Sequence, residues 1–149
     1  MAIQVQTEAF DAGQMLNALH ARHLGVGAVV GFVGYVRDFN EGQAVAGLTL
    51  EHYPGMTEKV LQTIVAEAGA RWPLLNVDIL HRVGKLEPGE PIVFVGVASS
   101  HRQAAFEACQ FVIDYLKTRA PFWKQENTPE GLRWVDSRAT DAEAMHKWA

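Results

Sequence analysis

Apolar and polar residues follow two rhythms along the chain, and these rhythms predict its helices and strands. Where apolar residues recur every three to four positions, one face of a helix can be buried. Where they alternate or run together, a strand is expected. The first rhythm predicts helices over residues 11–23, 57–72, 101–118 and 141–148. The second predicts strands over residues 3–6, 26–36, 48–53, 76–86, 92–98, 122–126 and 133–136. This order of elements indicates an α+β fold with a mixed or antiparallel sheet.

Polar residues at the element boundaries predict where the helices begin. Asp11 is expected to cap the first helix and Thr57 the second, because their side-chain oxygens can accept hydrogen bonds from free backbone N–H groups. Ser99 or Ser100 is expected to cap the third helix. The buried stripe of that helix is expected to contain Ala105, Ala108, Phe111, Val112, Tyr115 and Leu116. The strands at 26–36 and 92–98 are apolar on both faces, which predicts that they are buried.

The composition limits the class of protein. The chain has 149 residues, of which 48% are apolar and 20% charged, a balance typical of one globular domain spanning 1–149. Its net charge of −4 argues against a general nucleic-acid binder. The single cysteine, Cys109, excludes an internal disulfide, and its apolar neighbours indicate a packing role. The apolar runs are too short to span a bilayer and the first residues do not resemble a secretory signal, so a cytoplasmic protein is expected.

A basic stretch without acidic residues lies at the end of the predicted third helix. It carries Lys117, Arg119 and Lys124, and in an acidic chain it favours an anionic small ligand. Alternatively, Lys117 and Arg119 only complement the negative end of the helix dipole. Lys124 follows Phe122 and Trp123. Packing against these rings would desolvate the amine and suit it to proton transfer, unless the lysine stem simply covers the tryptophan.

Two other segments are candidates for anion binding. Ser99–Arg102 lies where a strand meets a helix N-terminus, so free backbone N–H groups and the side chains of His101 and Arg102 can attract an anion. Alternatively, it is a serine cap followed by two solvated residues. Gly31–Arg37 carries two glycines three positions apart, and Arg37 ends the strand where side chains reach a cleft. Neither segment contains a P-loop or a dinucleotide-binding motif.

Three histidines carry weaker signals. His20 and His23 are three positions apart on a predicted helix, but no third ligand lies at a fixed spacing, so a metal site is not expected. His81 falls on the apolar face of its strand, which predicts a hydrogen-bonded histidine of the core.

Four separated motifs occur along the chain in a specific order. They are Leu50–Met56, His81–Gly84, Ser99–Arg102 and Lys117–Lys124. Together they resemble the catalytic (large) subunits of molybdopterin synthase. The Ser-His-Arg element followed by Lys-x-x-x-Pro-x-Trp-Lys is the most specific part, and the similarity spans about residues 27–148.

This resemblance implies an α/β-hammerhead-like fold and a sulfurtransferase of molybdenum cofactor biosynthesis that needs no metal or redox cofactor. Members of the family convert cyclic pyranopterin monophosphate to molybdopterin by installing a dithiolene. The sulfur arrives as a thiocarboxylate on the Gly-Gly C-terminus of a small ubiquitin-like subunit. A central homodimer with one small subunit at each end, a heterotetramer overall, is also implied. The present chain ends in Lys147-Trp148-Ala149, so we expect it to be the catalyst rather than the sulfur donor.

Carried over to this chain, the resemblance assigns the catalytic roles to Lys117 and Lys124. It implies that the substrate-binding residues are Tyr35, Val36, Arg37, His101, Arg102, Lys117, Lys124, Gln125, Glu126 and Arg138. Among these, Arg37, His101 and Arg102 would contact the phosphate and the pterin. Tyr35 and Gln125 stand where some relatives have basic residues, so a less positive pocket is expected.

Two functions of other classes remain open. One is a non-catalytic scaffold for a ubiquitin-like partner, which would not need Lys117 and Lys124. The other is a regulatory domain that binds a phosphate ligand at the basic stretch. Helix geometry adds a constraint, because His101 and Lys117 are sixteen residues apart on one predicted helix. That spacing is about 24 Å, so we expect one site to combine residues of two protomers across a twofold axis.

Overall fold

The computed structural model describes the chain apart from residues 22, 41–42, 45, 130, 136–138 and 149. Its helices are α1 (Ala12–Ala21), α2 (Met56–Arg71), α3 (Arg102–Arg119) and α4 (Ala139–His146). Its strands are β1 (Ala2–Gln6), β2 (Ala28–Tyr35), β3 (Phe39–Asn40), β4 (Gln43–Ala44), β5 (Gly47–His52), β6 (Leu74–Arg82), β7 (Gly84–Leu86), β8 (Pro91–Ser99), β9 (Phe122–Thr128) and β10 (Gly131–Val135). Each predicted helix is confirmed, with ends that differ by a few residues.

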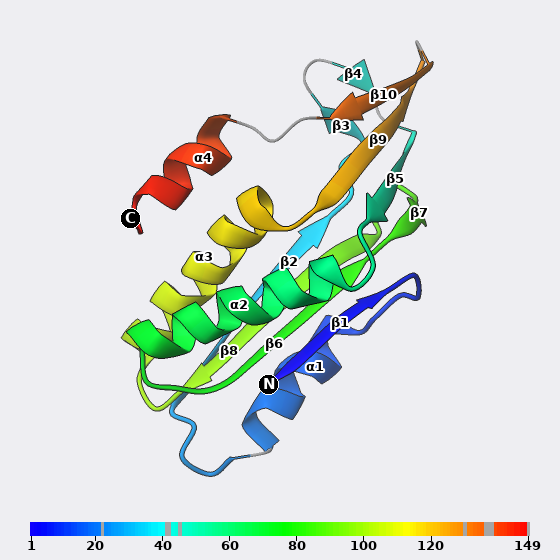
Figure 1. Ribbon diagram of the computed structural model, residues 1–149. Helices are drawn as coiled ribbons and strands as arrows, with labels where there is room; N and C mark the ends of the chain where they lie inside the picture. Colours follow the sequence, from blue (N-terminus) through cyan, green and yellow to red (C-terminus); the bar gives the residue numbers. More distant parts are fainter. Residues whose placement is uncertain (22, 41–42, 45, 130, 136–138, 149) are drawn as a thin grey trace.

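The strands form two main sheets and a short ribbon. The first sheet has the order β1-β6-β8-β2, in which β1 runs parallel to β6 and the other pairs are antiparallel. The second is antiparallel, with the order β10-β9-β5-β7, and β3 pairs with β4. Figure 1 shows α2 and α3 side by side on one face of the first sheet and α1 on the other. The expected α+β class with a mixed sheet is confirmed.

Strand β8 contributes to a core on each face of the first sheet. Val93, Val95 and Val97 pack in the larger core with α2 and α3, whereas Phe94 packs with Leu19 of α1 in a smaller core. This division follows because successive side chains of a strand point to opposite faces. The prediction of a central strand buried on both faces is confirmed for β8.

Strand β2 is the other strand that was expected to be buried on both faces, and this part of the prediction is wrong. It lies at the edge of the first sheet, and among the strands that the structure describes it pairs with β8 only. Most of its residues are half-buried. Its apolar pattern has a clear cause, because α1 and α3 both pack against it.

The strand predicted over residues 76–86 is divided into β6 and β7, which belong to different sheets. Gly84 adopts a φ of 89°, a left-handed conformation that favours glycine and turns the chain sharply. The Val83 N–H donates to the Gln6 carbonyl at 2.9 Å and so ends the pairing with β1. After the turn, β7 pairs with β5 instead.

Of the predicted helix caps, that of α1 is confirmed and that of α2 is wrong. The Gln14 N–H donates to Asp11 Oδ1 at 3.1 Å. The N-cap residue of α2 is instead Gly55, whose N–H donates to Glu58 Oε2 at 3.1 Å. Thr57 lies inside the first turn, fully buried, where its hydroxyl donates to the Tyr53 carbonyl at 3.0 Å.

Neither serine caps α3, so this prediction is also wrong. The N-cap residue is His101, which makes no side-chain capping hydrogen bond. The Ser99 hydroxyl donates to the Pro73 carbonyl at 3.0 Å, and the Ser100 hydroxyl donates to the Gly25 carbonyl at 3.2 Å. The two serines therefore tie the start of α3 to neighbouring loops.

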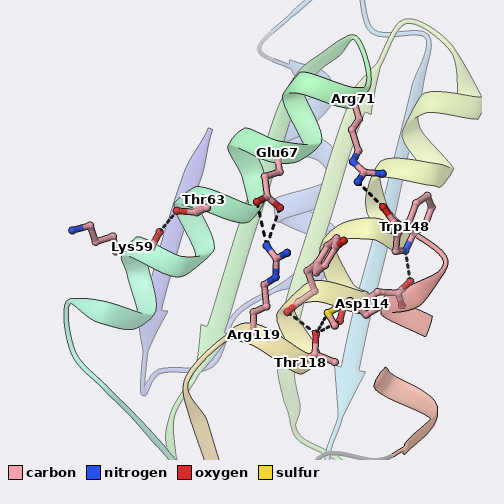
Figure 2. Close-up of polar contacts among 10 residues, drawn as sticks. Lys59, Thr63, Glu67, Arg71, Asp114, Thr118, Arg119 and Trp148 are labelled. Atoms are coloured by element: carbon pink, nitrogen blue, oxygen red, sulfur yellow. Dashed lines mark hydrogen bonds and ion pairs between the residues drawn. The ribbon is translucent and has the colours of Figure 1, made fainter. Parts of the chain in front are cut away.

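The C-terminal half of α3 is held by contacts with α2 and with the segment after α4 (Figure 2). Arg119 donates to Glu67 of α2 at 2.9 Å, and Arg71 donates to the Trp148 carbonyl at 2.6 Å. The Trp148 indole N–H donates to Asp114 Oδ2 at 2.7 Å. The contacts of Arg119 and Asp114 hold the C-terminal half of α3, which carries one of the two lysines of interest, and the Arg71 contact ties α2 to the same C-terminal segment.

Candidate active site

The two lysines assigned to catalysis lie on either side of one tight connection. Lys117 is in the last turn of α3, and Lys124 is the third residue of β9. The Ala120 N–H donates to the Leu116 carbonyl at 3.3 Å, and the Phe122 N–H donates to the Ala120 carbonyl at 2.9 Å. Both lysine side chains are half-buried. The connection therefore brings two cations to the same end of the fold.

A buried histidine, His81, lies close to these lysines. Its ring stacks on Phe122 with centroids 3.8 Å apart and an interplanar angle of 15°. Its Nδ1 is 2.8 Å from the Arg82 carbonyl oxygen. Burial lowers the pKa of His81 to about 3, although the Arg82 carbonyl opposes this shift, and the charges of Lys117 and Lys124 lower the pKa further. The prediction of a hydrogen-bonded core histidine is confirmed.

A second histidine, His52, ends β5 beside the same aromatic ring. It lies opposite Phe122 in the ladder of β5 and β9, with ring centroids 6.4 Å apart. His52 Nδ1 is 3.8 Å from Glu58 Oε1, which is too long for a hydrogen bond. Within the described part of the chain, both atoms are buried without a hydrogen-bond partner. His52 at the end of β5 and Glu58 in the first turn of α2 thus each have a buried polar atom that the described fold does not bond.

His52, His81 and Phe122 were not among the expected site residues. A signal was present, because each stands inside one of the motifs at 50–56, 81–84 and 117–124. Their proximity depends on strand pairing and ring stacking between distant segments, which spacing along the chain does not reveal.

Strand alternation separates Gln125 from its two neighbours. Lys124 and Glu126 point to one face of β9 and Gln125 to the other. Glu126 is only 7% exposed and lies opposite Leu48, whereas Gln125 is half-buried opposite Thr49. Within one chain, Lys124 and Glu126 therefore share a face that Gln125 does not reach.

The last residues of β2 lie at the same end of the first sheet as His81. On β8, Tyr35 pairs with Pro91 and His81 pairs with Val93, so the two residues are near the same end of the sheet. Arg37 follows Tyr35 by two residues, and both side chains are exposed.

Val36 is part of the core rather than of an open surface. It is 5% exposed, and its N–H donates to the Glu90 carbonyl at 2.9 Å. Its carbonyl accepts from the Gly89 N–H at 2.8 Å. The fold uses both backbone groups, so Val36 supports Tyr35 and Arg37 on either side of it.

His101 and Arg102 stand at the opposite end of α3 from Lys117. The helix is continuous from Arg102 to Arg119, and both side chains at its start are exposed. One chain therefore does not bring them to the lysines. Arg138, the last of the expected site residues, lies outside the described residues.

Arg119 binds residues of α2 and α3, so the candidates for ligand binding in the basic stretch are Lys117 and Lys124. Its guanidinium binds Glu67 and lies 4.1 Å from the centroid of the Tyr115 ring. The alternative that Arg119 supports the helix end rather than a ligand is consistent with these contacts.

Other candidate chemistry is weak in the part of the chain that the structure describes. It contains no group of three or more His, Cys, Asp or Glu side chains placed to hold a metal ion. Cys109 is buried among core residues, and burial raises the pKa of its thiol to about 11. Among the helices of the described residues, none has the length and apolar character needed to cross a membrane.

Comparisons with known proteins identify the family of this chain. A model of the MoaE protein family matches residues 5–119. A relative from Pseudomonas aeruginosa, named molybdopterin synthase catalytic subunit, is 71% identical over 99% of both chains. A solved molybdopterin biosynthesis MoaE protein from Burkholderia ambifaria is 55% identical over 99% of this chain and 98% of that one, with a TM-score of 0.85.

A more distant solved structure shares the fold alone. It is a complex of subunits 1 and 2 of molybdopterin-converting factor from Helicobacter pylori, and its matching chain is 20% identical with a TM-score of 0.76. The alignment covers 91% of each chain. The family match and the close relative together decide the classification: the chain belongs to the MoaE family, the catalytic subunits of molybdopterin synthase.

Proposed function

We propose that this chain is the catalytic half of a cytoplasmic sulfurtransferase that completes molybdopterin. Its substrate is cyclic pyranopterin monophosphate, and its sulfur comes from the thiocarboxylate on the Gly-Gly end of a small ubiquitin-like subunit. The observation that carries the proposal is the pair of half-buried lysines, Lys117 and Lys124, across the α3–β9 connection. A scaffold that only binds a partner has no need of this pair.

The lysines suit a reaction between two anions. The thiocarboxylate and the substrate phosphate both carry negative charge, and cationic amines stabilise the charge that develops when sulfur attacks the pterin. One lysine also donates a proton to the substrate oxygen that leaves. Partial burial strengthens both effects, because less water screens the charges.

The small subunit is proposed to deliver its sulfur through an extended tail. Two glycines without Cβ atoms can enter a passage that other residues would block. The Helicobacter pylori neighbour supports such a partner, because that structure is a complex of two subunits. The proposed assembly is a homodimer of this chain with one small subunit at each end.

The proposed binding set combines residues from two copies of the chain. It comprises Tyr35, Arg37, His101, Arg102, Lys117, Lys124, Gln125, Glu126 and Arg138, with Val36 supporting Tyr35 and Arg37 from the core. Because α3 is continuous, His101 and Lys117 are about 24 Å apart in one chain. We therefore place His101 and Arg102 of one protomer against the lysines of the other.

Reconstitution with a thiocarboxylated small subunit and cyclic pyranopterin monophosphate tests the activity. We expect dithiolene product from the unaltered chain and a rate at least about 100-fold lower for Lys117→Ala or Lys124→Ala. The matched control is Lys59→Ala, an exposed lysine on α2, which should retain the full rate. Absence of product from the unaltered chain would reject the activity, and normal rates for both site variants would reject the roles of the lysines.

Mixing two inactive variants tests the shared site. Lys117→Ala and His101→Ala chains should recover activity when heterodimers form, because one of the two sites in each heterodimer is then intact. Heterodimers that form but remain inactive would contradict a site built from two protomers.

A further inference from the structure

His81 is a buried polar residue beside the lysines to which the proposed chemistry gives no role. We infer that His81 is a positioning residue, whose distal ring nitrogen Nε2 offers an uncharged hydrogen-bond acceptor to the two-lysine site while its ring anchors Phe122 at the start of β9. The inference rests on the proposed function of this site, and it names a residue that acts through the lysines rather than on the substrate.

The hydrogen bond of His81 determines its tautomer. Nδ1 lies 2.8 Å from the carbonyl oxygen of Arg82, and a carbonyl can only accept, so Nδ1 carries the proton. In a neutral imidazole the lone pair is then on Nε2. Because Nδ1 is turned back to the main chain of β6, Nε2 lies at the distal edge of the ring, away from that strand.

The ring of His81 also holds the first residue of β9 in position. It stacks on Phe122 at 3.8 Å, and Phe122 stands two residues before Lys124. On its other flank, Phe122 follows Lys117 by five residues across the α3–β9 connection. A shift of the His81 ring would therefore displace the segment that joins the two lysines.

Burial keeps His81 neutral, and the charges around it act in the same direction. The nearby groups that oppose protonation of the ring are Lys117 from α3, Lys124 from β9 and His52 from β5. The adjacent guanidinium of Arg82 is turned to the carbonyls of Thr7 and Pro91. A neutral imidazole has a lone pair that can accept from a lysine ammonium, whereas a charged imidazole would repel it.

Three variants separate positioning from simple packing. His81→Asn keeps an N–H at the place of Nδ1 but removes Nε2, and His81→Gln carries its amide near the place of Nε2. Leu80→Ala is the control, because Leu80 is the preceding buried residue of β6 and packs in the smaller core with α1. It should lower stability without reaching the site.

The first readout does not depend on turnover. Reductive ¹³C-methylation allows the titrations of Lys117 and Lys124 to be followed by NMR, with signals assigned from Lys→Arg variants. Loss of the acceptor in His81→Asn should lower the pKa of at least one of them by about 0.5 or more. His81→Gln should recover part of the shift, and Leu80→Ala should leave both titrations unchanged. Unchanged lysine titrations in His81→Asn would overturn the inference.

The second readout is turnover in the reconstituted reaction. We expect His81→Asn to lower kcat about tenfold or more while KM changes by less than about twofold, because a displaced catalytic group loses rate rather than binding. A His81→Asn chain with the kcat of the unaltered protein would also overturn the inference. If the unaltered chain forms no product, the proposed function fails, and the NMR titration still tests the role of His81.

Discussion

Gly27 contacts the start of α3 so closely that a larger residue cannot fit without moving the backbone. Its N–H donates to the Ser99 carbonyl at 2.9 Å. A Cβ added at this position would lie 2.0 Å from the Ser100 carbonyl oxygen. Real Cβ atoms rarely come closer than 3.0 Å, so the two segments must separate by about 1 Å. Because the clashing atom belongs to the backbone, no rotamer change relieves it, and His101 moves with Ser100.

The Gly27→Ala substitution should therefore destabilise the protein. Overpacking of this kind costs about 1–3 kcal/mol. For a chain of this size, each kcal/mol lowers Tm by about 2–4 °C. Urea unfolding and thermal melts measure both quantities, and the NMR signals of residues 99–102 report whether the start of α3 has moved.

Gly69→Ala is the matched control for the same chemical change. Gly69 is an exposed residue inside α2, and an added Cβ there meets nothing within 4 Å. Replacing glycine in a helix stabilises it by about 0.5–1 kcal/mol. The two substitutions should thus have opposite signs, and a Gly27→Ala protein as stable as the unaltered chain would refute the reasoning.

Three further predictions concern buried residues. Cys109, whose thiol pKa is raised to about 11 by burial, should react with a disulfide reagent at pH 8 only after denaturant is added, and fast reaction of the folded protein would contradict its burial. Phe111→Ala should lower the free energy of unfolding by about 3–5 kcal/mol in urea, because this fully buried ring packs edge-on against Trp72, Tyr115 and Trp148. Because the pKa of His81 falls from 6.5 to about 3 on folding, the unfolded chain binds more protons than the folded one, and stability present above pH 6.5 is lost as the pH falls toward 3. The slope from this residue reaches about 1.4 kcal/mol per pH unit, and His81→Asn should remove it from unfolding curves measured between pH 4 and 7.

The regular part of the fold follows from local pattern, and the errors arise where tertiary context decides. Helix α3 has a long apolar stripe, and β8 is a continuous apolar run, so both are predicted closely. The alternation of Val77, Ile79, His81 and Val83 stops at Gly84, but a glycine in a strand pattern marks only a bend or bulge and does not show that the chain changes sheets there. The apolar pattern also does not show that β2 is an edge strand. Helices cover both of its faces, so it is as apolar as a central strand although it lies last in the sheet.

The charged residues of the candidate site could be predicted from the sequence, but the rings packed beside them could not. Lys117 and Lys124 stand out as cations in a stretch without acids. His81 matches a core histidine equally well by pattern, and its relation to the lysines depends on the stacking with Phe122. The separation of His101 from Lys117 was predictable, because the rise of a helix is constant.

The parallel pairing of β1 with β6 has a consequence for how the protein is made. Ala2 to Gln6 are synthesised before their partners, Asp78 to Arg82, which emerge more than seventy residues later. At a translation rate of about 5–20 residues per second, β1 therefore stays unpaired for at least several seconds before β6 is synthesised. Until it docks, β6 presents an unpaired edge to neighbouring nascent chains. Closing this long loop is the step at which high contact order slows folding, and an N-terminal fusion that obstructs it should reduce the yield of folded protein before it affects the finished fold.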